Sequence, residues 1–283
     1  MIEMGMENLK LAYGHKVGVS DFTFSVEGGE MLGLIGPNGS GKSTVIRAIS
    51  RVITPLSGRM LLGGRDIMKI PRSELACLLG VVPQIAILPG TFTAFEIVLM
   101  GRNPHLGFLE HESARDIDIA WQAMEMTRTH TFARRRVNEL SGGEIQRVVI
   151  ARVLAQEPES ILLDEPTASL DISHQVEVLD LIKKLCRENG LTVVIVLHDL
   201  NLAAQYCDRL VLMKEGTLYA RGTPYEVISE ENIRAVYGAE GCVYPHPDGG
   251  LPVVLPRAGG GRNSRAEDSE DVGKGRGLWR SFS

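Results

Sequence analysis

Residues 31–52, MLGLIGPNGSGKSTVIRAISRV, decide the fold class. The opening residues are mostly apolar and predict a short buried strand, and the segment from Ser43 onward has the apolar spacing of a helix. Between them, residues 36–44 match the pattern G-x-x-x-x-G-K-[ST]. A glycine-rich turn lets several backbone N–H groups point at a phosphate, and the following helix offers its positive end. The stretch therefore predicts a nucleotide-binding loop between a strand and a helix.

The residues of this loop have separate expected roles. Lys42 would reach the β- and γ-phosphates, and the hydroxyl of Ser43 would bind Mg²⁺. The alternative is a glycine-rich turn with a coincidental Lys-Ser, but the flanking strand and helix favour the phosphate site. The predicted nucleotide-binding residues are Gly36, Pro37, Asn38, Gly39, Ser40, Gly41, Lys42, Ser43 and Thr44.

Two later strands end in polar residues. SILLDEP (160–166) places Asp164 and Glu165 at the carboxyl end of a buried strand, and LTVVIVLHDL (191–200) ends another strand at His198. Ligands of open α/β sheets bind at this edge. We expect Asp164 to hold Mg²⁺, Glu165 to act as general base, and His198 to contact the terminal phosphate. Without the phosphate loop, a surface turn and a structural histidine would be the simpler interpretations.

The composition of the chain limits the classes of protein to which it could belong. The chain has 283 residues, 44% of them hydrophobic, and a net charge of −5, which argues against a general nucleic-acid binder. The four cysteines lie far apart and are expected to be reduced, three of them as core residues. No run of about 18 apolar residues predicts a membrane span. We expect a protein that stays inside the cell.

The segment LSGGE (140–144) contains two glycines in the first turn of a predicted helix. Ser141 and Glu144 have the spacing of a capping box, which accounts for both of them. It does not account for Gly142 and Gly143, because glycine weakens a helix. Bare backbone at a helix start suits a closely bound phosphate. Since residues 36–44 already supply one such site, we infer that this second site faces a nucleotide held by another copy of the chain.

Six short segments, GPNGSGKST, VPQ, LSGGE, LLDEP, SLD and LHD, occur in the order and spacing of the ATP-binding-cassette (ABC) ATPases. The resemblance covers about residues 3–240. It implies that Tyr13 stacks on adenine, that Gln84 senses Mg²⁺ and water, and that Asp171 couples two nucleotide sites. It also implies that Ser141, Gly142 and Gly143 bind the partner's γ-phosphate, with Glu165 and His198 as catalytic base and switch histidine. The sequence departs from the common pattern of these ATPases at Glu144, Ile145 and Ser160. None of these departures removes a chemical group that ATP hydrolysis needs.

The resemblance also implies a fold and a domain organisation. The fold class is α/β: a P-loop NTPase core with a parallel sheet, an N-terminal antiparallel β-subdomain and an inserted α-helical subdomain. The predicted ATP-binding domain spans residues 1–256, with the helical subdomain at about 85–157. Residues 257–283 are rich in Gly, Ser and charge and are expected to form a disordered tail.

The kind of cassette ATPase follows from what the chain lacks. It has no long coiled coil and no membrane helices, and it contains a single cassette. Among the cassette ATPases, we therefore expect a separate ATPase subunit docked on membrane permease subunits at the cytoplasmic face. The stretch GRNPH (101–105) resembles ATPases of importers for iron–siderophore, haem or cobalamin. Such a subunit would work, indirectly, with an extracytoplasmic substrate-binding protein. A turn without substrate information, an importer of another substrate, and a soluble ATPase of repair or signalling remain as alternatives.

Overall fold

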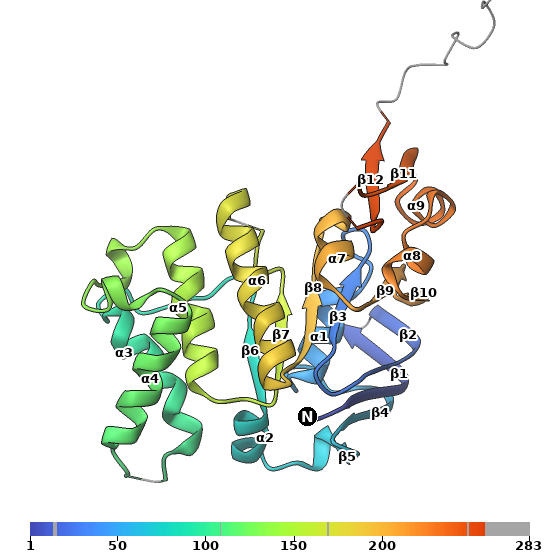
Figure 1. Ribbon diagram of the computed structural model, residues 1–283. Helices are drawn as coiled ribbons and strands as arrows, with labels where there is room; N and C mark the ends of the chain where they lie inside the picture. Colours follow the sequence, from blue (N-terminus) through green and yellow to red (C-terminus); the bar gives the residue numbers. More distant parts are fainter. Residues whose placement is uncertain (14–15, 108, 169, 248, 258–283) are drawn as a thin grey trace, which may run out of the picture.

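A six-stranded sheet forms the centre of the structure, a computed structural model that describes residues 1–13, 16–107, 109–168, 170–247 and 249–257 (Figure 1). Its strand order is β10-β9-β3-β8-β7-β6, and all neighbours are parallel except the β9–β10 hairpin. The strands are β3 (Met31–Ile35), β6 (Leu79–Val82), β7 (Ser160–Asp164), β8 (Thr192–Val196), β9 (Arg209–Lys214) and β10 (Thr217–Gly222). The predicted parallel α/β sheet is confirmed.

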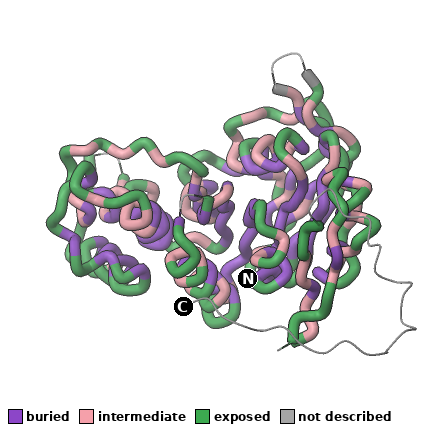
Figure 2. The backbone as a smooth tube through the Cα atoms, turned by 90° about the horizontal axis from the view of Figure 1, so that it is seen from above, coloured by how far each residue is buried: buried purple, intermediate pink, exposed green. Residues whose placement is uncertain are grey.

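Both faces of this sheet are covered. Alternate residues of β3 face opposite cores, with Met31 and Ile35 in one and Leu32 and Leu34 in the other. The first core lies under α5 (Gly142–Ala155), α6 (Ile172–Asn189) and α7 (Leu200–Tyr206). The second lies between the sheet, α1 (Lys42–Ile49) and the N-terminal strands. The buried stretches in Figure 2 follow these central strands, which explains why they read as continuous apolar runs.

The N-terminal strands form a separate antiparallel sheet, in the order β2-β1-β4-β5. Strands β4 and β5 form a hairpin around Gly63 and Gly64, with both glycines at positive φ. These elements are β1 (Met4–Tyr13), β2 (Lys16–Val26), β4 (Ser57–Leu62) and β5 (Arg65–Asp66), followed by η1 (Ile67–Lys69) and α2 (Arg72–Leu78).

A helical arm is inserted between β6 and β7 (Figure 1). Its helices pack on one another, and α3 begins at a capping box formed by Thr93 and Glu96. The assigned boundaries of the domain and of the helical subdomain stay predictions. The arm contains α3 (Ala94–Leu99), η2 (Met100–His105), α4 (Ala114–Met126), η3 (His130–Phe132), η4 (Val137–Glu139) and α5.

One helix face of the arm differs from the simplest expectation. Ile117, Ala120, Trp121 and Met124 share a face by spacing, yet only Ala120 and Met124 are buried. Ile117 and Trp121 are each 39% exposed, at the edge of the face that packs against α5 and α3. Trp121 stacks instead on Phe95 of α3, with ring centroids 5.0 Å apart.

The C-terminal elements pack beside β9 and α7. Helix α8 (Pro224–Val227) has Thr223 as its N-cap and Pro224 as its first residue. It is followed by α9 (Glu230–Tyr237) and by the hairpin of β11 (Gly241–Pro245) and β12 (Pro252–Pro256). The predicted tail lies, from residue 258, outside the described residues. None of the helices in the described ranges is long and apolar enough to span a bilayer.

Candidate functional site: a nucleotide pocket at the sheet edge

The phosphate loop joins β3 to α1, as the sequence predicts. Gly41 is the N-cap of α1 and has a φ of 105°, a conformation that residues with a Cβ avoid. Gly36 has a φ of 144°, and a Cβ there would collide with the carbonyl oxygen of Met213. Both glycines are therefore required by the fold of the loop itself.

Lys42 is almost completely buried within this loop. Its Nζ donates hydrogen bonds to the carbonyl oxygens of Gly36 at 2.8 Å and Pro37 at 3.0 Å. Burial lowers the pKa of Lys42, and the carboxylates of Glu165 and Asp164 partly offset this. The ammonium group is thus held at the loop, beside the carboxylates that follow β7.

Asp164 ends β7 directly beside the start of α1. The hydroxyl of Ser43 donates to its Oδ1 at 3.0 Å. Burial raises the pKa of Asp164, while the Ser43 hydrogen bond lowers it in part. A hydroxyl and a carboxylate this close are oxygen donors of the kind that Mg²⁺ prefers.

Glu165 connects the ends of three adjacent strands. Its Oε2 accepts from Nε2 of Gln84, which follows β6, and its Oε1 lies 2.6 Å from Nε2 of His198, which follows β8. The Gln84 contact is also 2.6 Å. Glu165 itself has a φ of 52°, a strained backbone of the kind that clusters at functional sites. The structure thus brings together the three residues assigned to catalysis.

Glu165 also lines a pocket of about 310 Å³ above the phosphate loop, together with Lys42 and Ser43. Gly18 of β2, which the sequence analysis missed, also lines it. Added Cβ atoms on Gly41 and Gly216 would both approach the carbonyl oxygen of Gly18, so its backbone is in close contact with the loop and with the β9–β10 turn. A glycine within a strand pattern is a signal of such close approach. The lining residues are Gly18, Asn38, Gly39, Gly41, Lys42, Ser43, Thr44 and Glu165.

Two further residues bear on this end of the site. Tyr13 is the last residue of β1, and the described part of the structure does not include its side chain. Tyr237, at the end of α9, was missed: its hydroxyl lies near the backbone of Gly36 without a hydrogen bond of normal geometry, and burial raises its pKa to about 12. The phosphate loop is therefore backed by the C-terminal part of the chain.

The residues assigned to the second phosphate site do not line this pocket. Ser141 caps α5 in the predicted box, with its N–H 2.8 Å from Glu144 Oε2. A Cβ on Gly142 would meet no atom within 4 Å, and one on Gly143 would meet Leu170 at 3.4 Å and His174 at 4.0 Å. Asp171 caps α6 through the N–H of His174 at 2.9 Å. The fold of the chain itself does not require the glycine at 142.

The GRNPH stretch has a structural role inside the arm. Gly101 approaches the backbone of Arg152 so closely that a Cβ would collide with its carbonyl oxygen. Arg102 is buried and binds Asp116 Oδ1 at 2.9 Å, the Ala155 carbonyl at 2.7 Å and Glu157 at 2.9 Å. These contacts tie η2 to α4 and to the end of α5.

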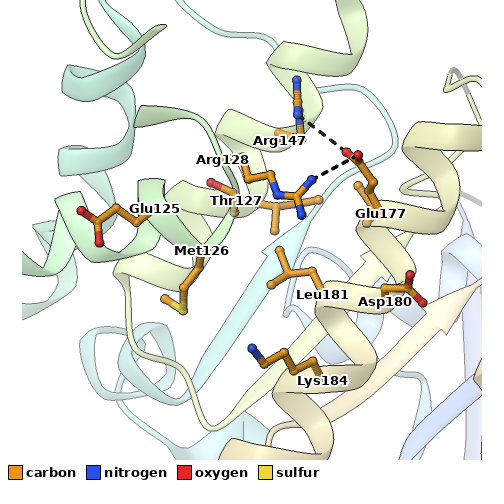
Figure 3. A pocket seen from close by; sticks show the side chains of 11 residues that line it. Glu125, Met126, Thr127, Arg128, Arg147, Glu177, Asp180, Leu181 and Lys184 are labelled. Atoms are coloured by element: carbon orange, nitrogen blue, oxygen red, sulfur yellow. Dashed lines mark hydrogen bonds and ion pairs between the residues drawn. The ribbon is translucent and has the colours of Figure 1, made fainter. Parts of the chain in front are cut away.

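A second pocket, of about 440 Å³, lies between the arm and α6 (Figure 3). Arg128 and Arg147 of the arm both point toward Glu177 of α6, at 3.4 Å and 3.8 Å. Partly exposed ion pairs are screened by water and contribute little each. The contact between the arm and α6 at this point is therefore polar and weak.

Known proteins show what this chain is similar to. The ABC transporter family model matches residues 19–168. The ferric enterobactin transport ATP-binding protein FepC of Escherichia coli is 40% identical over 250 residues, 88% of this chain and 92% of its own. The hemin import ATP-binding protein HmuV of Gloeobacter violaceus is 45% identical over 235 residues, 81% of this chain and 84% of its own.

Solved structures give the same answer. A chain of a transporter described as of the metal-chelate ABC type, in an inward-facing conformation, superposes with a TM-score of 0.79 at 27% identity, covering 91% of this chain and 98% of its own. The dimeric post-hydrolysis cassette MJ0796, bound to ADP and Pi, has a TM-score of 0.69 at 30% identity and covers 78% of this chain and 98% of its own. The chain therefore belongs to the ABC transporter family, within which it is an ATP-binding subunit that hydrolyses ATP.

Proposed function

We propose that this chain is the ATPase subunit of an importer for a metal chelate such as an iron–siderophore complex, haem or cobalamin. The observation that carries the ATPase half of the proposal is the cluster of Gln84, Glu165 and His198 at the pocket above Lys42. The importer half is supported by the relatives, which are named for ferric enterobactin and hemin. The substrate stays open among these chelates because the ATPase subunit does not contact the cargo.

Hydrolysis is assigned to the carboxylate of Glu165. Glu165 accepts the proton of the attacking water, while Gln84 orients that water and His198 contacts the γ-phosphate. In the described geometry both Glu165 oxygens already have partners, Gln84 and His198. The two partners must therefore turn toward water and phosphate before the reaction.

Ser43, Asp164 and Gln84 are proposed to hold Mg²⁺. The adjoining oxygens of Ser43 and Asp164 fit this ion, and the burial of Asp164 gives its charge a strong effect there. When bound, Mg²⁺ neutralises charge on the β- and γ-phosphates. The chain's own contribution is to fix the oxygen donors beside Lys42.

A head-to-tail dimer is proposed to complete each nucleotide site. Ser141, Gly142 and Gly143 of one copy would face the γ-phosphate held by residues 36–44 of the other, with Asp171 between the two sites. The open space around Gly142 supports this, as does Ile172, which follows Asp171 and is 80% exposed. An apolar side chain so exposed at a helix start suits burial against a partner.

Replacing Gly142 by alanine separates the two explanations of that glycine. Because the added Cβ meets no atom of its own chain, the melting temperature is expected to stay the same or rise slightly. The Cβ would obstruct a phosphate approaching the helix start, so ATPase activity should fall at least about tenfold. Steady-state hydrolysis and thermal unfolding measure the two effects. Unchanged activity would contradict the proposed second phosphate site.

Membrane permease subunits are proposed to dock beside Gln84. Ile85 is 77% exposed and Ile87 is 94% exposed, and Phe92 follows at 36%. Exposed apolar residues next to a catalytic residue suit a partner whose movement is coupled to hydrolysis. This surface would place the chain at the cytoplasmic face of the membrane, with the binding protein of the importer on the other side.

The variant Ile87→Glu tests this docking surface. It places a charge where an apolar contact is proposed, and since Ile87 touches little of its own fold, stability and basal hydrolysis should remain. Co-purification with membrane permeases encoded beside the gene should be lost. The matched control is Val52→Glu, because Val52 is 73% exposed and lies after α1. If neither the parent nor the variants bind any permease, the alternative of a soluble ATPase gains support.

A further inference from the structure

The side chain of Asn201 in α7 hydrogen-bonds the C-terminal hairpin. Val254 of β12 is opposite Val243 in a pair that does not exchange hydrogen bonds, because the bonded pairs alternate through Leu251–His246 and Arg257–Glu240. Its N–H and C=O therefore point to the outer edge. There the N–H donates to Asn201 Oδ1 at 2.8 Å, and Asn201 Nδ2 donates to the carbonyl at 3.3 Å.

Asn201 also contacts the loop that carries His198. Its backbone N–H donates to Oδ1 of Asp199 at 2.7 Å, and Asp199 is the N-cap of α7 and the residue after His198. Among the described residues, the side-chain partner of the His198 ring is Glu165. The side chain of His198 is 42% exposed, so packing alone does not fix it. Its position depends on the first turn of α7.

Helix α7 needs such an attachment because it has only seven residues. A helix this short is stable only through tertiary contacts. Its far end is held by the hydroxyl of Tyr206, which donates to Asp180 of α6 at 2.9 Å. Helix α7 and β12 lie near each other in Figure 1, and the end of α7 near His198 has the two-point contact between Asn201 and β12.

We propose that Asn201 is a positioning residue for ATP hydrolysis. By pairing with the backbone of Val254 it fixes the first turn of α7, and through Asp199 it fixes the loop that presents His198 to Glu165. The C-terminal hairpin thus belongs to the hydrolytic machinery without contacting the nucleotide. This inference rests on the proposed contact of His198 with the γ-phosphate.

Two variants test the contact from its two sides. Asn201→Ala removes the amide, and Val254→Pro removes the outward N–H at an edge position where the strand pairing does not use it. Each is expected to lower kcat about tenfold while KM for ATP with Mg²⁺ stays within about twofold, because the phosphate loop is untouched. The double variant should lose no more than Asn201→Ala alone, since Asn201→Ala already removes both hydrogen bonds to Val254.

The control is Asn232→Ala, which removes a comparable hydrogen bond from Asn232 Nδ2 to the Val227 carbonyl, 2.9 Å long, within the same C-terminal region. It should shift the melting temperature to a similar extent and keep kcat. An equal loss of kcat in this control, a further loss in the double variant, or unchanged kcat in both test variants would overturn the inference.

His198→Ala separates failure of the inference from failure of the proposed function. If His198→Ala keeps the parent kcat, the proposed role of His198 is wrong. If it abolishes hydrolysis while Asn201→Ala and Val254→Pro remain fully active, only the positioning role of Asn201 is wrong. Purified full-length chain, ATP and Mg²⁺ suffice for all of these measurements.

Discussion

Replacement of Glu165 by glutamine is expected to lower kcat for ATP hydrolysis about 10³-fold, within the range that a general base contributes. Glutamine keeps an oxygen that can accept from Gln84 or His198, so the cluster at the sheet edge should persist. It cannot take the proton of the attacking water. Bound ATP should then remain intact and hold two copies together, which size-exclusion chromatography with and without ATP would detect.

The matched control for this variant is Glu159→Gln. Glu159 immediately precedes β7, and Glu165 follows the other end of that strand. The backbone N–H of Glu159 donates to the carbonyl of Leu78, a contact that does not involve the side chain. The Glu159→Gln variant should hydrolyse ATP with the same kcat as the parent chain. A Glu165→Gln variant with kcat within tenfold of the parent would exclude Glu165 as the base. A variant that is inactive but monomeric at saturating ATP would contradict the proposed dimer.

The second large effect is expected for stability, at Arg102. Arg102→Met leaves the carboxylate of Asp116, whose side chain is only 11% exposed, without its cationic partner. Breaking a buried pair from one side costs about 3 kcal/mol or more in the free energy of unfolding. Urea denaturation of the parent and the variant measures the difference. Because η2 and α4 lose a shared contact, the helical arm should unfold first.

Exposure and pH provide two checks on this expectation. Arg65 pairs with Glu74 at 2.5 Å, but both side chains are largely exposed, so Arg65→Met should change stability little. The hydrogen bonds with Ser113, and after them the contact with Arg102, lower the pKa of Asp116. The ionised carboxylate therefore stabilises the fold at pH values above the pKa that Asp116 has in the unfolded chain. This stabilisation is lost as the pH falls. The difference between the parent and Arg102→Met should therefore shrink below about pH 4. A difference that is independent of pH would show that lost packing, and not the ion pair, is responsible.

The sequence predicted the local chemistry of the site well, because each signal was complete within a few residues. The phosphate loop, the Ser141–Glu144 box and the strand ending at Asp164 are read from neighbouring positions. That Gln84, Glu165 and His198 meet also follows, since parallel strands share one edge. Ser160 departs from the apolar residues that are usual in this buried strand. The strand accommodates it because its hydroxyl donates to the Leu78 carbonyl.

The contacts that the sequence did not reveal join distant segments. Nothing near Asn201 indicates Val254, and nothing near Gly18 indicates Gly41 and Gly216. Arg102 was interpreted through its resemblance to an importer motif, whereas the structure shows it bound to Asp116 and to the end of α5. The spacing of apolar residues in α4 indicates one shared face, but it does not indicate which of them stay exposed, because that depends on how α3 and α5 pack against α4.

The place of β3 has a consequence for biosynthesis. Both of its sheet neighbours, β8 and β9, lie about 160 residues or more further along the chain. On the ribosome the phosphate loop is synthesised early, yet its strand cannot pair with β8 until Val196 has emerged from the exit tunnel, or with β9 until Leu212 has emerged. A nascent chain therefore exposes apolar β3 through most of translation, which makes it a natural client for chaperones. The sheet that carries the phosphate loop is therefore completed only after β8 and β9 have been synthesised.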